Sequence, residues 1–225
     1  MNVVKAYYKL NMKMLFKDKL AFIWSVFLPS IFLILNKDTI KSILDMRYFW
    51  SYVIFSSYVF GVGLHSLIQK EEGTLKTYFS IKESRIEFFI ANVLTQMTFC
   101  FISILLFNIF AMIIFKMKLI LMIIYSLILI VLSIPLTFLF FNITLIKNIH
   151  VNSLNTFLTI ITMIFLFIMH NDTIVNLINP LIYISNILVL DSVNEILLYI
   201  GISIICVISG LYSIKNYSVI SNEKR

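Results

Sequence analysis

The chain has 225 residues, of which 60% are hydrophobic and only 13% are charged. A soluble domain is about half apolar and a quarter charged, so this composition excludes a water-soluble domain. It predicts an all-α polytopic membrane protein, because about 20 apolar residues make one spanning helix and the length fits six of them.

The first predicted element, residues 1–19, is an amphipathic helix in the membrane interface. Lys5, Lys9, Lys13 and Lys17 recur every four positions, so on a helix they cover an arc of about 120°. Apolar side chains occupy most of the opposite face. Such a helix turns its lysines toward water and the anionic head groups of membrane lipid. The alternative is a basic flank without fixed geometry.

Six uncharged segments follow, and each is predicted to be a transmembrane helix. They cover residues 20–36, 48–69, 88–115, 119–146, 148–170 and 196–214. A weaker apolar interval, 173–190, contains the turn signal Asn179-Pro180. We predict that this interval is an outer re-entrant segment between helices five and six, made of two short helical pieces. Residues 1–225 are thus predicted to form a single transmembrane domain.

The distribution of charge predicts the orientation. With both termini cytoplasmic, thirteen of the eighteen Lys and Arg residues are inside, whereas the eleven acidic residues divide six inside and five outside. The inner face then carries the whole net charge of +7, as positive-inside bias predicts. Topology therefore accounts for the basic excess, and no nucleic-acid partner is expected.

The predicted spans lack the residues that membrane chemistry usually requires. None contains an Asp, Glu, Lys or Arg, which argues against an ion-coupled transporter or an intramembrane enzyme. The five glycines do not form a phosphate-binding loop. Cys100 and Cys206 lie in apolar runs and are interpreted as small buried side chains. The Gly61-Val62-Gly63 sequence indicates close helix packing.

The predicted cytoplasmic loop, 70–85, is polar but patterned. Glu72 and Lys76 stand at i,i+4 in the favourable orientation for an ion pair. Three apolar residues share one face of a short helix: Leu75, Tyr78 and Phe79. A helix of two turns is unstable alone in water. The three side chains therefore either pack against the chain's own bundle or insert into a cytosolic partner.

The segment Glu71-Glu72-Gly73-Thr74-Leu75-Lys76-Thr77-Tyr78-Phe79, followed by Ser84-Arg85 and an apolar span, resembles the first cytoplasmic loop of ABC-2 type transporter permeases. These are membrane subunits of bacterial ABC exporters. In that family an acidic pair, Gly-Thr and Leu open a short coupling helix. The layout of an interfacial helix, six spans and an outer re-entrant segment is also similar. Many members have a Pro near Lys82 and a Gly-Lys near Ala91-Asn92, which this chain lacks.

The resemblance implies a permease subunit that is not itself an enzyme. Together with a second permease chain, identical or sister, it would enclose a path across the bacterial plasma membrane. Two cytosolic ABC ATPase subunits would carry ATP and Mg²⁺, leaving this chain without a cofactor or metal. The expected cargo is an amphipathic peptide, drug or lipid-like compound. The implied ATPase-docking residues are Glu71, Glu72, Gly73, Thr74, Leu75, Lys76, Tyr78 and Phe79.

Two other classes of function fit parts of the sequence. Glu71-Glu72 with His65 and His150 resemble the acids and ligands of an intramembrane CAAX-type metalloprotease, which would activate water on zinc. Those enzymes need an Arg where this chain has Lys76, and both histidines, like His170, lie near the ends of predicted spans. Zinc in the purified protein would favour this class. The other class is a non-transporting membrane immunity or accessory protein.

Overall fold

The computed structural model describes residues 3–17, 19–76, 79, 83–147, 149–169, 176 and 179–218. The described residues are helical with no strand among them, which confirms the predicted all-α class. The main helices are α1 (Val3–Lys17), α2 (Lys19–Leu35), α3 (Arg47–Ser56), α4 (His65–Glu71), α6 (Arg85–Phe115), α7 (Leu119–Leu132), α8 (Ile134–Phe141), α9 (Val151–Ile168), α10 (Pro180–Asn186) and α11 (Val193–Asn216). Short 3-10 helices cover Lys37–Thr39, Ile43–Met46, Asn142–Leu145 and Ile187–Val189, and a π-helix, Ser57–Leu64, joins α3 to α4.

Four helical stretches of the described chain are long and apolar enough to cross a membrane. They are Ile43–Glu71, Arg85–Phe115, Val151–Ile168 and Val193–Asn216. Leu119–Leu132 and Ile134–Leu145 make a fifth if this pair, bent by 41°, is one span. Pro135 at the start of α8 fits this bend, because proline cannot donate a backbone hydrogen bond. The molecule is therefore compatible with a multi-pass membrane protein.

The first of the six predicted spans, 20–36, is shorter in the structure than the others. It corresponds to α2, a helix of 17 residues from Lys19 to Leu35. At a rise of about 1.5 Å per residue this helix extends about 26 Å, whereas the hydrocarbon core is about 30 Å thick. By length and composition, the described residues contain four helices that are long enough to span a membrane, or five if the bent pair is counted as one span.

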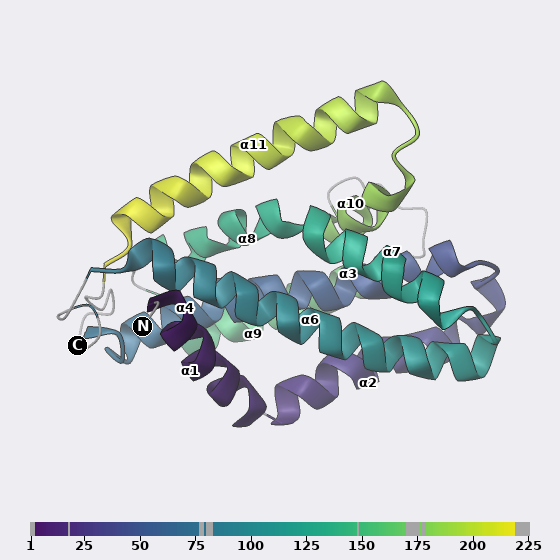
Figure 1. The fold of residues 1–225 in the computed structure, drawn as a ribbon, viewed down its shortest axis with the longest axis horizontal. Coiled ribbons are helices and arrows are strands. Elements are labelled where there is room, and N and C mark those ends of the chain that lie inside the picture. The colour runs from purple at the N-terminus through teal and green to yellow at the C-terminus, as the bar shows by residue number, and fades with distance from the viewer. Residues whose placement is uncertain are drawn as a thin grey trace.

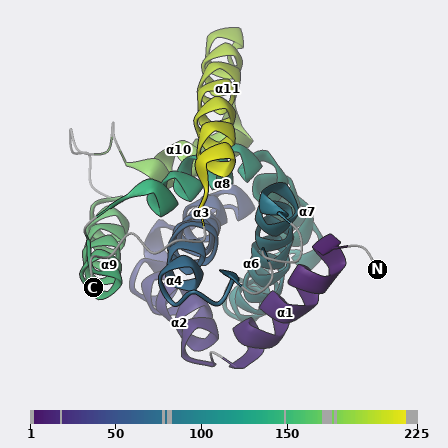
Figure 2. The same cartoon turned by 90° about the vertical axis from the view of Figure 1, so that its left-hand side faces the viewer.

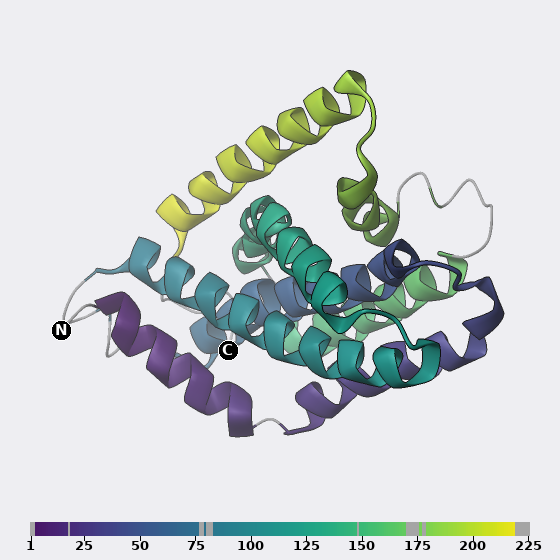
Figure 3. The ribbon, with the colours of Figure 1, turned by 45° about the vertical axis from the view of Figure 1, so that its right-hand side comes forward.

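Successive long helices run back and forth between two ends of the bundle (Figure 1). The beginnings of α1 and α6 and the ends of α4 and α11 lie at one end, on the left of Figure 1. The turns from α2 to α3 and from α6 to α7 lie at the opposite end, together with α10 (Figures 1 and 3). We call the first the basic end, because these helix termini carry Lys5, Lys70, Arg85 and Lys215.

The second long helix, from Ile43 to Glu71, is the centre of the bundle. About 72% of its apolar window is buried, compared with 17% for α9 and for α11, which lie at the periphery. Figure 2 shows α11 standing out from the other helices. Two aromatic side chains of the central helix form hydrogen bonds to neighbouring helices, because lipid offers polar atoms no partners. Trp50 Nε1 donates to Asn108 Oδ1 (2.7 Å), and the Tyr58 hydroxyl donates to the Ile130 carbonyl (3.0 Å).

Helix α1 packs across the first half of α6 (Figures 1 and 3). The Tyr7 ring meets the Phe88 ring edge-to-face at 5.7 Å. The four regularly spaced lysines of α1 are all exposed. Asn11, which interrupts the apolar face in the sequence, is buried at the contact and donates to Asn92 Oδ1 of α6. The polar residue that interrupts the apolar face of α1 therefore forms a specific contact between α1 and α6.

Helix α10 begins at the predicted Asn-Pro turn. The Asn179 side chain accepts a hydrogen bond from the Leu181 N–H (3.0 Å) and donates one to the Phe165 carbonyl (2.9 Å). Pro180 takes the first helical position, where no N–H is needed. α10 packs on α3 at the end opposite the basic end. Residues 173–175, 177 and 178 of the predicted re-entrant segment lie outside the described residues.

Helix α11 joins the bundle mainly through α8, and Gly210 is where the two backbones approach most closely. A Cβ at Gly210 would lie 2.4 Å from Phe138 Cβ and 2.6 Å from its carbonyl oxygen. Gly201, nine residues earlier in α11, has nothing within 4 Å of an added Cβ. The two glycines therefore form a matched pair within one helix.

We expect Gly210→Ala to destabilise the protein by about 1–3 kcal/mol, because α11 has to move away from α8. Gly201→Ala should leave stability unchanged or raise it slightly, since alanine is the better helix former. Thermal unfolding of both variants in the same detergent measures the difference. Equal midpoints would contradict the α8–α11 contact.

Candidate functional site

The loop at the basic end holds the residues that the family resemblance assigned to docking. Gly73 has a φ of +70° and ends α4. Its N–H bonds to the Lys70 carbonyl (3.1 Å), and the Thr74 hydroxyl donates to the Gln69 carbonyl (3.0 Å). A left-handed glycine just after the last helical turn is a common helix end. The end of α4 therefore accounts for Gly73, whether or not the loop also docks to a partner.

The loop residues divide into a buried and an exposed set. Leu75 is only 2% exposed and belongs to the hydrophobic core, and Phe79 packs half-buried against that core. Leu75, expected as a docking contact, thus has almost no surface to offer a partner. Among the described residues that were assigned to docking, three have exposed side chains, and we call them the loop face: Glu72, Thr74 and Lys76. Tyr78 lies outside the described residues.

The predicted helix from Glu72 to Phe79 is interrupted. Gly73 breaks the helical geometry after α4, and among the described residues of the loop Lys76 and Phe79 are helical again, with the Phe79 N–H bonded to the Leu75 carbonyl at 2.9 Å. For this reason Glu72 and Lys76, both within the described part of the loop, do not form the ion pair that their spacing predicted. A glycine directly after an acidic pair and a basic residue is itself a helix-end signal, and it could have corrected this prediction.

An aromatic cluster, defined as Tyr7, Phe79, Phe88, Phe141 and Tyr217, lies beneath the loop. The rings of Phe79 and Phe88 are 6.2 Å apart, and each also contacts Tyr217, at 6.2 and 5.6 Å. Phe141 approaches Tyr217 at 5.3 Å. Such pairs contribute about 0.5–1.5 kcal/mol beyond their buried area. The cluster thus connects the loop to α1, α6, α8 and the segment after α11.

Lys70 is a buried cation next to this cluster. It is 2% exposed, and its Nζ donates to the Thr144 carbonyl at 3.0 Å. Nζ also lies 5.9 Å from the centroid of the Tyr217 ring, within the range of a cation–π contact. The sequence placed Lys70 at the edge of a span as an ordinary inner-face charge. Only the tertiary structure brings it against Thr144, seventy-four residues later.

A cavity of about 760 Å³, which we call the polar cavity because uncharged polar side chains lie among its apolar ones, is lined by α1, α2, α3, the π-helix, α4, α6 and α9. The described residues that line it include no Asp, Glu, Lys or Arg. Its aromatic walls are Trp24, Tyr52, Phe60 and Phe99. Its polar walls are Asn11, Ser25, Ser56, Ser57, His65, Asn92, Thr95, Gln96, Asn155, Thr159 and Thr162. This mixture of uncharged amides, hydroxyls and rings suits a neutral amphipathic ligand.

The π-helix shapes one wall of the cavity. π-Helical turns are rare and frequently occur at functional sites. Gly61 within it leaves room for the Gln96 side chain, whose Cδ would lie 2.0 Å from a Cβ at that position. Gly63 approaches α8, where an added Cβ would lie 2.6 Å from the Phe140 carbonyl oxygen. The close helix packing predicted for these glycines is therefore confirmed at Gly63.

A chain of hydrogen bonds joins the cavity wall to the aromatic cluster. Asn92 accepts from Asn11 and donates to the Ser66 hydroxyl (2.8 Å), which in turn donates to the Val62 carbonyl (2.6 Å). The Tyr217 hydroxyl donates to the Ser66 carbonyl (3.0 Å). Ser66 is therefore held from the cavity side by Asn92 and from the cluster side by Tyr217. The buried Asn11 Oδ1 accepts no bond from the described residues.

The histidines considered for a metal site are spread over the molecule. His65 lines the cavity and its Nε2 bonds Gln69 Nε2 at 2.9 Å, whereas His150 is exposed at the start of α9. His170 lies outside the described residues. Within the described ranges, no three His, Cys, Asp or Glu side chains lie close enough to hold a metal ion. Cys100 and Cys206 are free and buried, as predicted.

Sequence reasoning missed the polar cavity, although part of its signal was present. Asn92, Thr95, Gln96 and Phe99 lie at helical spacing near the beginning of a long apolar span. A polar stripe in such a span indicates contact with protein or water instead of lipid. The residues from α1 and α9 that complete the cavity could not be connected to α6 without the tertiary structure.

Comparison of this chain with protein-family models, curated proteins and solved structures gave no match. The functional argument therefore depends on the geometry of the loop, the aromatic cluster and the cavity.

Cysteine labelling tests the division of the loop into two sets. Lys76→Cys should react with a membrane-impermeant maleimide in inside-out vesicles much faster than Leu75→Cys, because only position 76 is exposed. The two native thiols are buried and give little background. Gel filtration checks that both variants fold, and equal labelling rates would contradict the burial of Leu75.

Proposed function

We propose that this chain is the permease subunit of an ABC exporter, driven by a separate cytosolic ATPase. The observation that supports it most directly is the continuous contact path from the loop to the polar cavity. Phe79 contacts Tyr217, Tyr217 bonds to Ser66, and Ser66 bonds to Asn92 in the cavity wall. A path of this kind suits a protein whose cargo site is moved by an external motor.

The proposal places the basic end at the cytoplasmic side of a bacterial plasma membrane, with both termini inside. α2 is then the first of six spans, and the bilayer adapts to its short apolar part by local thinning and snorkelling lysines. α10 and the residues before it form the outer re-entrant segment. The net charge of +7 on the inner face supports this orientation.

In this mechanism the ATPase contacts the loop face. Its closure on ATP moves the loop, and Phe79 transmits the movement to the aromatic cluster. Tyr217 and Ser66 pass the displacement to Asn92, and the cavity between α1, α6 and α9 changes shape. Buried close-packed elements transmit such shifts because they are stiff. The buried ammonium of Lys70 stabilises Tyr217 and the end of α8 during this step.

The cavity supports a cargo that is amphipathic and uncharged where it contacts the wall. Burying an unpaired charge there would cost several kcal/mol, and the described lining offers no counter-charge. Amides and hydroxyls, in contrast, can bond to the amide groups of a peptide or the polar groups of a drug.

A second permease chain is supported by the surface of α9. Five polar side chains are exposed on this apolar helix, and all but Ser153 follow one face of it: Asn152, Ser153, Asn155, Thr156 and Thr159. A polar stripe facing lipid is unfavourable, so in a membrane it is better covered by protein or by a water-filled path. Two chains that bring these stripes together would extend the cavity across the membrane.

Exchange of the loop-face charges tests docking. The double variant Glu72→Lys/Lys76→Glu should abolish most vanadate-sensitive ATPase activity that co-purifies with the tagged chain from native membranes. The matched control is Lys37→Glu/Asp38→Lys, which exchanges exposed charges at the opposite end. Undiminished ATPase in the loop variant removes the docking assignment.

A second experiment tests transmission. Thr159→Cys carries an environment-sensitive fluorophore in the cavity, and ATP with vanadate traps the complex. Tyr217→Phe, which loses the hydrogen bond to Ser66, should reduce the fluorescence change while the ATPase still co-purifies. Tyr199→Phe is the control, because Tyr199 also donates to a backbone carbonyl, that of Leu132 (2.6 Å), away from the path. Equal responses of both variants and the parent would contradict transmission through Tyr217.

A further inference from the structure

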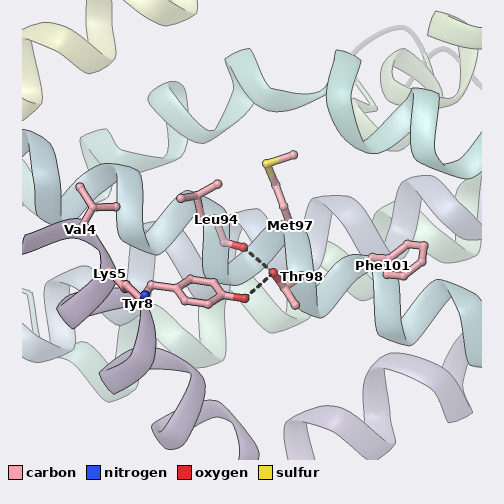
Figure 4. A pocket seen from close by; sticks show the side chains of 7 residues that line it. All are labelled: Val4, Lys5, Tyr8, Leu94, Met97, Thr98 and Phe101. Carbon is pink, nitrogen blue, oxygen red and sulfur yellow. Dashed lines mark hydrogen bonds between the residues drawn. The ribbon is translucent and has the colours of Figure 1, made fainter. Parts of the chain in front are cut away.

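A second depression, separate from the polar cavity, lies where α1 crosses α6. It is an open groove of about 560 Å³. Val4, Lys5 and Tyr8 form its α1 side, and Leu94, Met97 and Phe101 form most of its α6 side (Figure 4). Its walls are apolar except for Lys5 and the hydroxyls of Tyr8 and Thr98. Unlike the polar cavity, this groove contains a cation.

The hydroxyl groups of Tyr8 and Thr98 in the groove already donate their hydrogen bonds within the protein. The Thr98 hydroxyl donates to the Leu94 carbonyl at 2.9 Å. The Tyr8 and Thr98 oxygens are 3.0 Å apart, so Tyr8 must be the donor in that pair. Lys5 is exposed and forms no ion pair with any described residue. Among the described lining residues, only Lys5 therefore offers a free donor and a positive charge.

The groove has a direction that matches the bilayer. Lys5 belongs to the first turn and a half of α1, at the basic end. Leu94, Met97 and Phe101 follow one another along α6 away from that end (Figure 4). The distance from Leu94 to Phe101 along the helix is about 10 Å at about 1.5 Å per residue. The charge thus lies toward the membrane surface, and the apolar floor extends toward the interior.

We propose that this groove binds an anionic phospholipid of the inner leaflet, with the phosphate on Lys5 and one acyl chain along Leu94, Met97 and Phe101. Charge complementarity selects an anionic head group, since the groove contains no acidic side chain among its described residues. A free phosphate would leave the apolar floor uncovered. The bound lipid would fix α1 against α6. The inference takes the cytoplasmic position of the basic end from the proposed function, but it does not depend on transport or on the ATPase.

Native mass spectrometry tests the site. The protein is reconstituted in phosphatidylcholine nanodiscs that contain phosphatidylglycerol as a minor component, and the lipid retained after extraction is counted. We expect wild type to retain phosphatidylglycerol preferentially. Lys5→Gln should lower that retention about fivefold, the change that corresponds to about 1 kcal/mol for one lysine at an anionic surface. Retention of phosphatidylcholine should not change.

Two further variants separate a specific site from general attraction. Lys13→Gln removes an equally exposed lysine of α1 that does not line the groove, and it should retain phosphatidylglycerol nearly as wild type does. Met97→Trp fills the groove without changing charge and should lower retention of both lipids. The proposal is overturned if Lys5→Gln and Lys13→Gln lose phosphatidylglycerol equally. It is also overturned if Met97→Trp leaves retention unchanged or wild type shows no preference.

Discussion

The hydrogen bond from Tyr217 to the Ser66 carbonyl is the contact on which the arrangement of the basic end depends. It ties the segment after α11 to the central helix, whereas the rest of α11 lies at the periphery and meets mainly α8. The ring of Tyr217 is buried among Phe79, Phe88 and Phe141, so the bond is shielded from water. Loop, last helix and central helix consequently meet at one side chain.

Next to this contact, three of the buried polar residues of the bundle form one connected group. Asn11, Ser66 and Asn92 bond to one another across three helices, and they lie between the aromatic cluster and the cavity. In a membrane an unpaired polar group is costly, so a polar residue in a span needs a partner or a ligand. Asn11 and Asn92 meet part of that requirement by bonding to each other, and Asn92 also bonds to Ser66.

The two depressions of the surface differ in chemistry in a way that separates their proposed occupants. The large cavity has no formal charge among its described lining residues and many hydrogen-bonding groups. The groove between α1 and α6 has one cation, Lys5, at the basic end of the bundle, and an apolar floor. Helix α1 contributes to both, with Asn11 on the cavity side and Lys5 on the groove side. A lipid that holds α1 would therefore also influence the shape of the cavity.

The sequence alone determined the helical class, four of the long apolar helices and the bent pair α7–α8, the exposed lysine face of α1 and the turn at Asn179-Pro180. These features follow from local composition and spacing, which a single segment contains in full. The sequence could not decide whether Leu75 faced a partner or the bundle, because both choices bury the same apolar side chain.

Tertiary structure decided that question in favour of the bundle, and it also brought Lys70 to Thr144 and Asn11 to Asn92. The polar cavity, built from seven helical elements, likewise exists only after packing. Each of these depends on contacts between residues far apart in the chain. Such contacts leave no periodic signal, since either partner alone resembles an ordinary polar residue in its own helix.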